Sequence, residues 1–233
     1  MRLILFDIDG TILLTDGAGR RAIERAMLDL EGTAGPIVDH RFDGKTDPQI
    51  VRELLALAGH PAAESDARVR AVCDYYVRCL ADELAKPTQA TRVMVGVRAL
   101  LDALEEVEAD GRAMVGLLTG NVEHGAALKL QSAGIAPNRF RVGAYGSDAA
   151  HRPELPAIAQ RRAAERIGRP IAGSDVVIIG DTPDDVRCGR PIGARTVAVA
   201  TGWYDVAALS AAGAMHVFAD LSDTARVIET LLS

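Results

Sequence analysis

The sequence has few cysteines and lacks the histidine spacing typical of zinc enzymes. Its three cysteines, Cys73, Cys79 and Cys188, form no C-x-x-C motif and are too sparse for a disulfide-stabilised secreted scaffold. The five histidines include no H-x-x-x-H pair. These absences argue against a disulfide framework and a zinc site. We therefore expect reduced thiols and a cytoplasmic location.

Long apolar runs and a surplus of positive charge are also missing. The apolar residues 3–6 are interrupted by Asp7, and no apolar span of about 18 residues occurs elsewhere. We therefore expect neither a signal peptide nor a membrane span. The net charge of −6 argues against a nucleic-acid or membrane partner, because proteins hold those partners through basic surfaces. A small anionic ligand remains open.

Short runs rich in β-branched residues or leucine recur along the chain, each bounded by Gly, Asp or Thr. They occupy residues 2–6, 113–118, 175–179 and 195–200. Alanine-rich amphipathic segments lie beside them, at residues 95–109, 121–133, 153–167, 183–190 and 222–232. This alternation predicts an α/β fold, a doubly wound parallel sheet covered by helices.

Residues 17–86 break this alternation. They carry helical patterns at 18–30, 47–58 and 63–85, with turn signals near 35 and 59 and no strand pattern. We therefore predict a helical cap domain over residues 17–86, inserted after the first strand. The α/β core domain then comprises residues 1–16 and 87–233.

Three polar motifs follow three of the predicted strands. They read D-I-D-G-T at 7–11, T-G-N at 119–121 and G-D-T-P-D-D at 180–185. Ligands of open α/β sheets bind beyond the carboxyl ends of the strands, so the three motifs are expected to share one crevice. The second and third motifs also have a purely structural interpretation, because both are suited to start a helix.

The acidic pair of the first motif is harder to explain without a ligand. Crowded carboxylates at the end of a buried strand are unfavourable, and a bound cation would neutralise them. Asp7 and Asp181, with water and a substrate phosphate, offer the oxygen ligands that Mg²⁺ prefers. We therefore predict Mg²⁺ as the cofactor, which would also let a phosphate dianion approach an aspartate.

In this order, and with a helical insert after the first, the three motifs resemble the haloacid dehalogenase superfamily. The branch they resemble contains phosphoglycolate-phosphatase-like and β-phosphoglucomutase-like proteins. The resemblance implies a Mg²⁺-dependent hydrolase that cleaves a small phosphate monoester, of which phosphoglycolate is one candidate, through an aspartyl-phosphate intermediate. Asp7 would be the nucleophile, and Asp9 would protonate the leaving oxygen and then activate water.

The resemblance also implies roles for the remaining motif residues. Thr119 would hold the phosphoryl oxygens together with nearby groups of Gly10, Gly120 and Asn121. Asp181 would bind Mg²⁺ with the Asp7 carboxylate and the Asp9 carbonyl, and Asp185 would orient these ligands.

The sequence departs from the family at the lysine that usually balances the phosphate charge. Lys129 is the only lysine between residues 119 and 181, and it lies inside a predicted helix, a poor place for that role. Arg152 precedes a proline and a predicted helix, where the family has Lys-Pro. We therefore assign the role to Arg152, with Arg162 as the second choice and a surface arginine as the alternative.

Two segments of the predicted cap resemble ligand-binding motifs. Lys45, in G-K-T-D at 44–47, begins a helix and is placed to meet a phosphate or carboxylate of the substrate, or else is a solvated lysine. The segment G-A-G-R-R-A at 17–22 matches a dinucleotide-binding pattern. It comes too far after the first strand to form that turn, so we expect a hinge or a helix start.

Two other functions remain open. A sugar-phosphate mutase of the β-phosphoglucomutase type would keep the same core motifs. A non-enzymatic receiver module also carries a phosphorylated Asp, but a receiver has no helical insert of this size. In either enzyme the partner is a small phosphorylated metabolite, and the sequence leaves both a monomer and a homodimer open.

Overall fold

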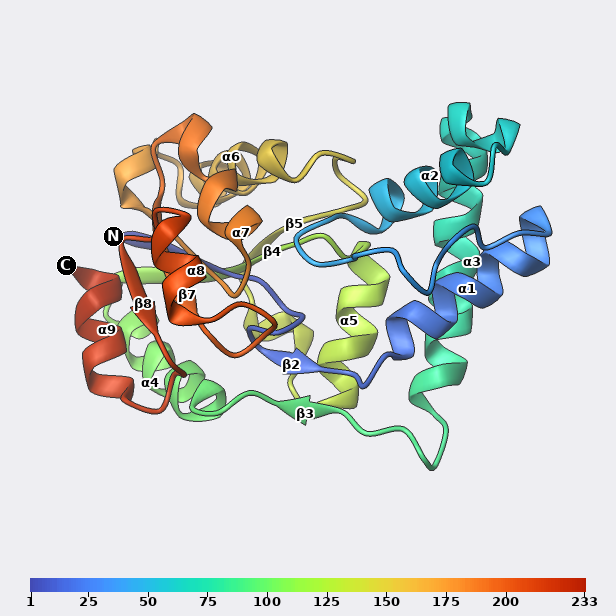
Figure 1. Ribbon diagram of the computed structural model, residues 1–233. Helices are drawn as coiled ribbons and strands as arrows, with labels where there is room; N and C mark the ends of the chain where they lie inside the picture. The colour runs from blue at the N-terminus through green and yellow to red at the C-terminus, as the bar shows by residue number, and fades with distance from the viewer.

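The computed structural model describes residues 1–233 and contains one six-stranded parallel sheet. The spatial order is β5-β4-β1-β6-β7-β8, with helices on both faces, so the predicted α/β fold class is confirmed (Figure 1). The strands are β1 (Arg2–Phe6), β4 (Ala113–Thr119), β5 (Val142–Tyr145), β6 (Val176–Gly180), β7 (Arg195–Val199) and β8 (His216–Phe218).

The helices of this core pack on the two faces of the sheet. They are α4 (Val97–Ala109), α5 (Glu123–Ser132), α6 (Leu155–Ile167), α7 (Pro183–Cys188), α8 (Val206–Ala211) and α9 (Thr224–Leu232). Single 3₁₀ turns occupy Pro61–Glu64, Pro137–Arg139, Arg152–Glu154, Gly173–Asp175 and Arg190–Ile192.

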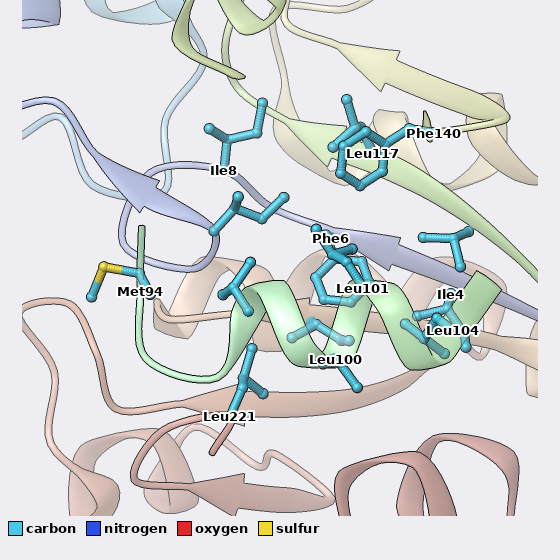
Figure 2. Close-up of a cluster of buried hydrophobic side chains, with 14 of the residues drawn as sticks. Ile4, Phe6, Ile8, Met94, Leu100, Leu101, Leu104, Leu117, Phe140 and Leu221 are labelled. Atoms are coloured by element: carbon cyan, nitrogen blue, oxygen red, sulfur yellow. The ribbon is translucent and has the colours of Figure 1, made fainter. Parts of the chain in front are cut away.

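Strand β1 lies in the middle of the sheet and is buried on both faces. Ile4 and Phe6 pack against α4 in the larger hydrophobic cluster, whereas Leu3 and Leu5 point to the opposite cluster under α6 (Figure 2). A strand covered on both sides loses the alternation of polar and apolar residues, which explains why its sequence is continuously apolar.

The sequence did not predict strands β5 and β8 or helix α8. Each is short: β5 has four residues, β8 has three and α8 has six. Such segments do not hold enough residues to display a periodicity. Strands β5 and β8 form the two edges of the sheet, and the predicted strands lie between them.

Three helices, α1 (Ala18–Glu31), α2 (Asp47–Leu57) and α3 (Asp66–Leu84), form a separate group beside the sheet (Figure 1). They bury their own hydrophobic cluster, which includes Ile23, Leu54 and Tyr76. The short antiparallel strands β2 (Leu13–Leu14) and β3 (Arg92–Val93) lie on the two chain segments that join this group to the core. We propose residues 17–86 as a cap domain on this basis.

The segment at residues 17–22 starts a helix. Gly17 is the N-terminal cap of α1, which begins at the next residue. No helix of the structure combines the length and the apolar composition that crossing a lipid bilayer requires.

Candidate active site

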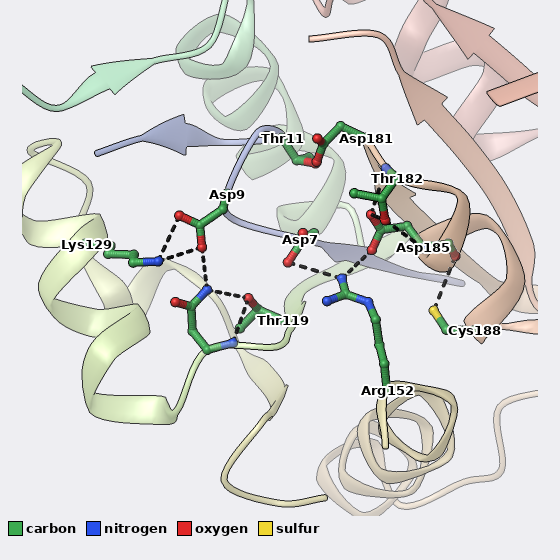
Figure 3. Close-up of polar contacts among 11 residues, drawn as sticks. Asp7, Asp9, Thr11, Thr119, Lys129, Arg152, Asp181, Thr182, Asp185 and Cys188 are labelled. Carbon is green, nitrogen blue, oxygen red and sulfur yellow. Dashed lines mark hydrogen bonds and ion pairs between the residues drawn. The ribbon is translucent and has the colours of Figure 1, made fainter. Parts of the chain in front are cut away.

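The three polar motifs meet because their strands are neighbours. Strand β1 lies between β4 and β6, so the carboxyl ends of all three strands open on the same edge of the sheet. The Asp7 backbone N–H donates to the Ile179 carbonyl at 2.9 Å, which continues the pairing of β1 with β6 past the strand. Asp7, Thr119 and Asp181 are all buried at this edge (Figure 3).

Three buried carboxylates form a cluster at the centre of the site. Asp7, Asp181 and Asp185 each offer an oxygen, and these oxygens all lie within 4.8 Å of one another. Burial raises the pKa of Asp7 to about 6, although Arg152 opposes the rise. Burial, together with the charges of Asp185 and Asp7, raises the pKa of Asp181 well above its ordinary value. Such a cluster of hard oxygen donors with excess negative charge is suited to a divalent cation.

Asp185 belongs both to a helix cap and to this cluster. Its Oδ2 accepts hydrogen bonds from the Thr182 backbone N–H at 3.0 Å and from Thr182 Oγ1 at 2.7 Å. The first of these bonds forms a capping box at the start of α7, together with the Asp185 backbone N–H, which donates to Thr182 Oγ1 at 3.1 Å. Its Oδ1 accepts a hydrogen bond from Arg152. The structural interpretation of the third motif therefore holds, and the same side chain also orients a charged partner.

Arg152 lies among the carboxylates, whereas Arg162 does not contact them. The Arg152 side chain is 4% exposed, and its Nη2 lies 3.2 Å from Asp7 Oδ1. Burial acts to lower the pKa of Arg152, but the charges of Asp185 and Asp7 outweigh it and raise that pKa well above the ordinary value. Arg162 instead forms a bidentate pair with Asp148, at 2.6 and 2.7 Å.

Asp9 turns away from the carboxylate cluster and is held by Lys129. Lys129 Nζ donates to Asp9 Oδ1 at 2.8 Å and to Oδ2 at 2.7 Å, and the lysine side chain is 6% exposed. Asn121 Nδ2 donates to the same Oδ2 at 2.7 Å. Both oxygens of Asp9 therefore accept hydrogen bonds (Figure 3), while 40% of its side chain is exposed.

The sequence analysis missed this contact of Lys129. The ion-pair partner of Asp7 is Arg152 and not Lys129, as expected, but Lys129 is a buried residue of α5. A signal was present, because Lys129 lies three residues after Ala126 and next to Leu130, on the apolar side of the helix. A buried ammonium needs a partner, and Asp9 is that partner.

The second motif, residues 119–121, forms hydrogen bonds within the site and also with the first residue of α2. Thr119 Oγ1 accepts a hydrogen bond from Asn121 Nδ2 at 2.8 Å. The Gly120 carbonyl accepts from the Asp47 backbone N–H at 2.8 Å, and Asp47 Oδ2 accepts from the Val122 backbone N–H at 2.8 Å. The first residue of α2 is thus joined directly to the loop after β4.

Gly10 is required where the first and third motifs meet. Its φ of +84° is a conformation that L side chains rarely adopt, and a Cβ there would lie 2.2 Å from Asp181 Oδ2. The Gly10 carbonyl also accepts a hydrogen bond from Thr201 Oγ1 at 2.6 Å. The D-G-T segment therefore leaves room for the Asp181 carboxylate.

Lys45 lies in the loop before α2 and is held in an ion pair. Its ammonium group is bonded to Glu53 and lies 3.3 Å from His40 Nε2, so it is paired within the cap and is not free in solvent. Its role as a substrate ligand stays a prediction.

Comparisons with known proteins agree with this geometry. Residues 154–224 match the family model described as HAD-hydrolase-like. No curated protein sequence matches the chain. Among solved structures, a hydrolase from Pseudomonas syringae superposes with a TM-score of 0.72 at 21% identity, over 100% of both chains.

Two further structures are similar over nearly the whole length. A predicted phosphoglycolate phosphatase from Haemophilus somnus has a TM-score of 0.69 at 18% identity, covering 98% of both chains. CbbY from Rhodobacter sphaeroides, solved in complex with phosphate, has a TM-score of 0.69 at 18% identity, covering 96% of both. A mutant of CbbY was solved with xylulose-(1,5)bisphosphate.

The chain therefore shares the fold of these structures over nearly its whole length. The resemblance to the haloacid dehalogenase superfamily is confirmed by the family model over residues 154–224, and the solved structures show that the fold is shared. The match to a hydrolase model also agrees with the enzyme class expected from the three motifs.

Proposed function

We propose that the protein is a Mg²⁺-dependent phosphatase that hydrolyses small phosphate monoesters through an aspartyl-phosphate on Asp7. The observation that carries this proposal is the buried cluster of Asp7, Asp181 and Asp185 with Arg152 beside it. Three carboxylates and one guanidinium leave excess negative charge in a buried space. That charge suits a hard divalent cation, and the cation makes the space suitable for a phosphate dianion.

The donor set fits Mg²⁺. Asp7 and Asp181 would bind it through their carboxylates and Asp9 through its main-chain carbonyl, with Asp185 orienting them. When bound, the ion neutralises the carboxylates and the developing charge on the phosphoryl group. Asp181 is already fixed, because its Oδ1 accepts a hydrogen bond from Thr11 Oγ1 at 2.9 Å.

The covalent step uses the two aspartates of the first motif. A carboxylate oxygen of Asp7 attacks phosphorus, the bond from phosphorus to the ester oxygen breaks, and Asp9 gives its proton to that oxygen. In the second step Asp9 takes a proton from water, and the resulting hydroxide attacks the aspartyl-phosphate. Asp7 is released with inorganic phosphate as the product, so Asp9 is protonated again for the next cycle.

The remaining groups hold the phosphoryl oxygens and exclude water. Thr119, with groups of Gly10, Gly120 and Asn121, donates hydrogen bonds to these oxygens, and Arg152 balances charge beside Asp7. The cap covers the site while the ester bond breaks, since bulk water would compete with Asp7 for the phosphorus atom. We also propose a cytoplasmic location, which suits three free and buried cysteines.

The test is phosphate release from a panel of phosphorylated metabolites, in Mg²⁺ and in excess EDTA. The proposal predicts release in Mg²⁺ and its loss in EDTA; turnover that persists in EDTA would contradict the metal assignment. Analysis of the products distinguishes a mutase, because a mutase returns an isomerised sugar phosphate in place of inorganic phosphate.

A further inference from the structure

One buried hydroxyl group in the cap has no hydrogen-bond partner. Tyr76, on α3, is 1% exposed, and its Oη is among three buried side-chain polar atoms without a partner. Buried hydroxyl groups normally find a partner, because leaving one unpaired destabilises the folded state. An orphan of this kind is therefore a candidate for contact with a ligand.

The orphan hydroxyl borders the catalytic residues. A Cβ added at Gly19, on α1, would lie 3.5 Å from Lys129 Nζ and 3.7 Å from Tyr76 Oη. The hydroxyl of Tyr76 and the ammonium group of Lys129 therefore both border the position that a side chain at Gly19 would take, and that position has room for a methyl-sized group. Lys129 is the residue that holds Asp9, the proposed proton donor to the leaving group.

A second orphan atom lies beside the same carboxylate. Asn121 bonds Asp9 Oδ2 through its Nδ2, and its Oδ1 is buried without a partner. One free O–H donor and one free oxygen acceptor thus lie near the Asp9 and Lys129 pair. A hydroxyl group suits either kind of orphan atom, because it can accept a hydrogen bond from an O–H and donate one to an oxygen.

The charge around this space also favours a neutral ligand over an anion. Lys129 is already paired with both oxygens of Asp9, and its charge also acts on the nearby carboxyl group of Asp47, whose pKa burial raises to about 6. No surplus positive charge is left for a carboxylate. An uncharged hydroxyl enters without that penalty.

We propose that Tyr76 is a specificity-determining residue that binds a hydroxyl group on the leaving-group side of the substrate. The substrate class is then a polyol or sugar phosphate, with a hydroxyl close to the ester oxygen. This inference rests on the proposed phosphatase function, since it concerns the leaving group of that reaction. It also implies that the unpaired hydroxyl group of Tyr76 serves substrate binding while it lowers the stability of the folded protein.

The experiment compares kcat/KM for 2-hydroxyethyl phosphate, ethyl phosphate and 2-phosphoglycolate, which differ at one position of a two-carbon leaving group. Wild type should prefer the hydroxyl compound over both others. Tyr76→Phe should lower the ratio of hydroxyethyl to ethyl phosphate roughly tenfold, the worth of one neutral hydrogen bond. Tyr76→Phe should also raise Tm, because it removes an unpaired buried hydroxyl.

The matched control is Tyr75→Phe on the same helix. The hydroxyl of Tyr75 donates to Asp29 at 3.0 Å on the exposed face of α3, so this variant should keep the wild-type ratio. Gly19→Ala should lower the ratio as Tyr76→Phe does, since its methyl group enters the same space. Alanine also stabilises a helix relative to glycine, so the loss cannot be ascribed to unfolding.

The outcomes separate this inference from the proposed function. If wild type hydrolyses none of the phosphate esters in the metabolite panel, the phosphatase proposal itself fails. If wild type is active but Tyr76→Phe keeps the wild-type ratio, the role of Tyr76 is wrong. If 2-phosphoglycolate is the preferred compound of the three, the site takes a carboxylate and the hydroxyl assignment is overturned.

Discussion

The Arg152 guanidinium lies 3.2 Å from the Asp7 carboxylate and is bonded at the same time to Asp185. A single cation thus connects the end of β1 with the start of α7, inside a cluster of like charges. Two functions follow from this position. Arg152 offsets repulsion between the carboxylates, and we propose that its guanidinium also balances the charge of the phosphoryl group beside Asp7.

Arg152→Ala should lower kcat/KM by roughly 10²-fold or more, because a preorganised cation beside the reacting group is lost. Arg152→Lys should recover part of the activity, since it restores the charge without the planar fork. Arg162→Ala is the control, because Arg162 pairs with Asp148 away from the cluster. Phosphate release is measured alongside circular dichroism to verify folding. If Arg162→Ala loses activity and Arg152→Ala keeps wild-type kcat/KM, the charge-balancing role belongs to Arg162.

Lys129→Ala should lower kcat by roughly tenfold or more, as part of the ~10²–10⁴-fold that an acid/base group contributes. Lys129 acts here as a positioning residue for Asp9, so the loss should be larger for an alkyl phosphate than for p-nitrophenyl phosphate, whose leaving group needs no proton. The control is Lys86→Ala, which removes a half-exposed lysine paired with Glu83. An equal loss with both substrates would assign Lys129 a merely structural role.

The difference between Lys129 and Arg152 illustrates what the sequence can predict. Arg152 was found because it stands at a fixed place in the chain order of the motifs, immediately before a proline and a helix. The contact between Lys129 and Asp9 joins positions 120 residues apart and depends on how α5 packs against the loop after β1. No local pattern encodes that contact, although the buried lysine was itself a signal.

The same distinction applies to the fold. The central strands and long helices were predicted because each is long enough to display its periodicity, whereas the edge strand β8, at three residues, is not. The contact of Asp47 with the loop after β4 was also missed. It depends on the docking of the cap onto the core, a tertiary arrangement that helix patterns do not specify.

Asp181→Asn should raise the Mg²⁺ concentration needed for half-maximal binding, because a neutral amide replaces a charged ligand. Trp203 is the only tryptophan, and its side chain is exposed. The preceding residue, Gly202, lies against the carboxylate of Asp181, because a Cβ added at Gly202 would be 1.9 Å from Asp181 Oδ2. Intrinsic fluorescence should therefore report metal binding. The control is Asp184→Asn, whose carboxylate is half-exposed and pairs with Arg187. If the Mg²⁺ titrations of wild type and Asp181→Asn coincide, Asp181 is not a metal ligand.

Asp47→Asn should change how stability depends on pH. Burial raises the pKa of Asp47 from 3.8 to about 6. Between these values the folded protein holds a proton that the unfolded chain has lost, so this carboxyl lowers stability as pH rises from about 4 to 6. Above pH 6, the ionised Asp47 lowers the free energy of unfolding by about 3 kcal/mol in total.

Urea unfolding of wild type and Asp47→Asn across this pH range measures the effect. The variant should gain stability over wild type as pH rises from about 4 to 6, since the amide cannot ionise and its oxygen can still accept from Val122. Asp74→Asn, at an exposed position of α3, is the control. A constant difference between wild type and Asp47→Asn at every pH would refute the prediction.

The central claim, that Asp7 is the nucleophile of a Mg²⁺-dependent phosphatase, is tested most directly by phosphate release from wild type and Asp7→Asn in the same assay. The amide cannot form the aspartyl-phosphate, so the account predicts loss of turnover. The fold should be retained, because removing one buried carboxylate relieves repulsion from Asp185 and Asp9. Asp7→Asn that is folded and as active as wild type would contradict the account.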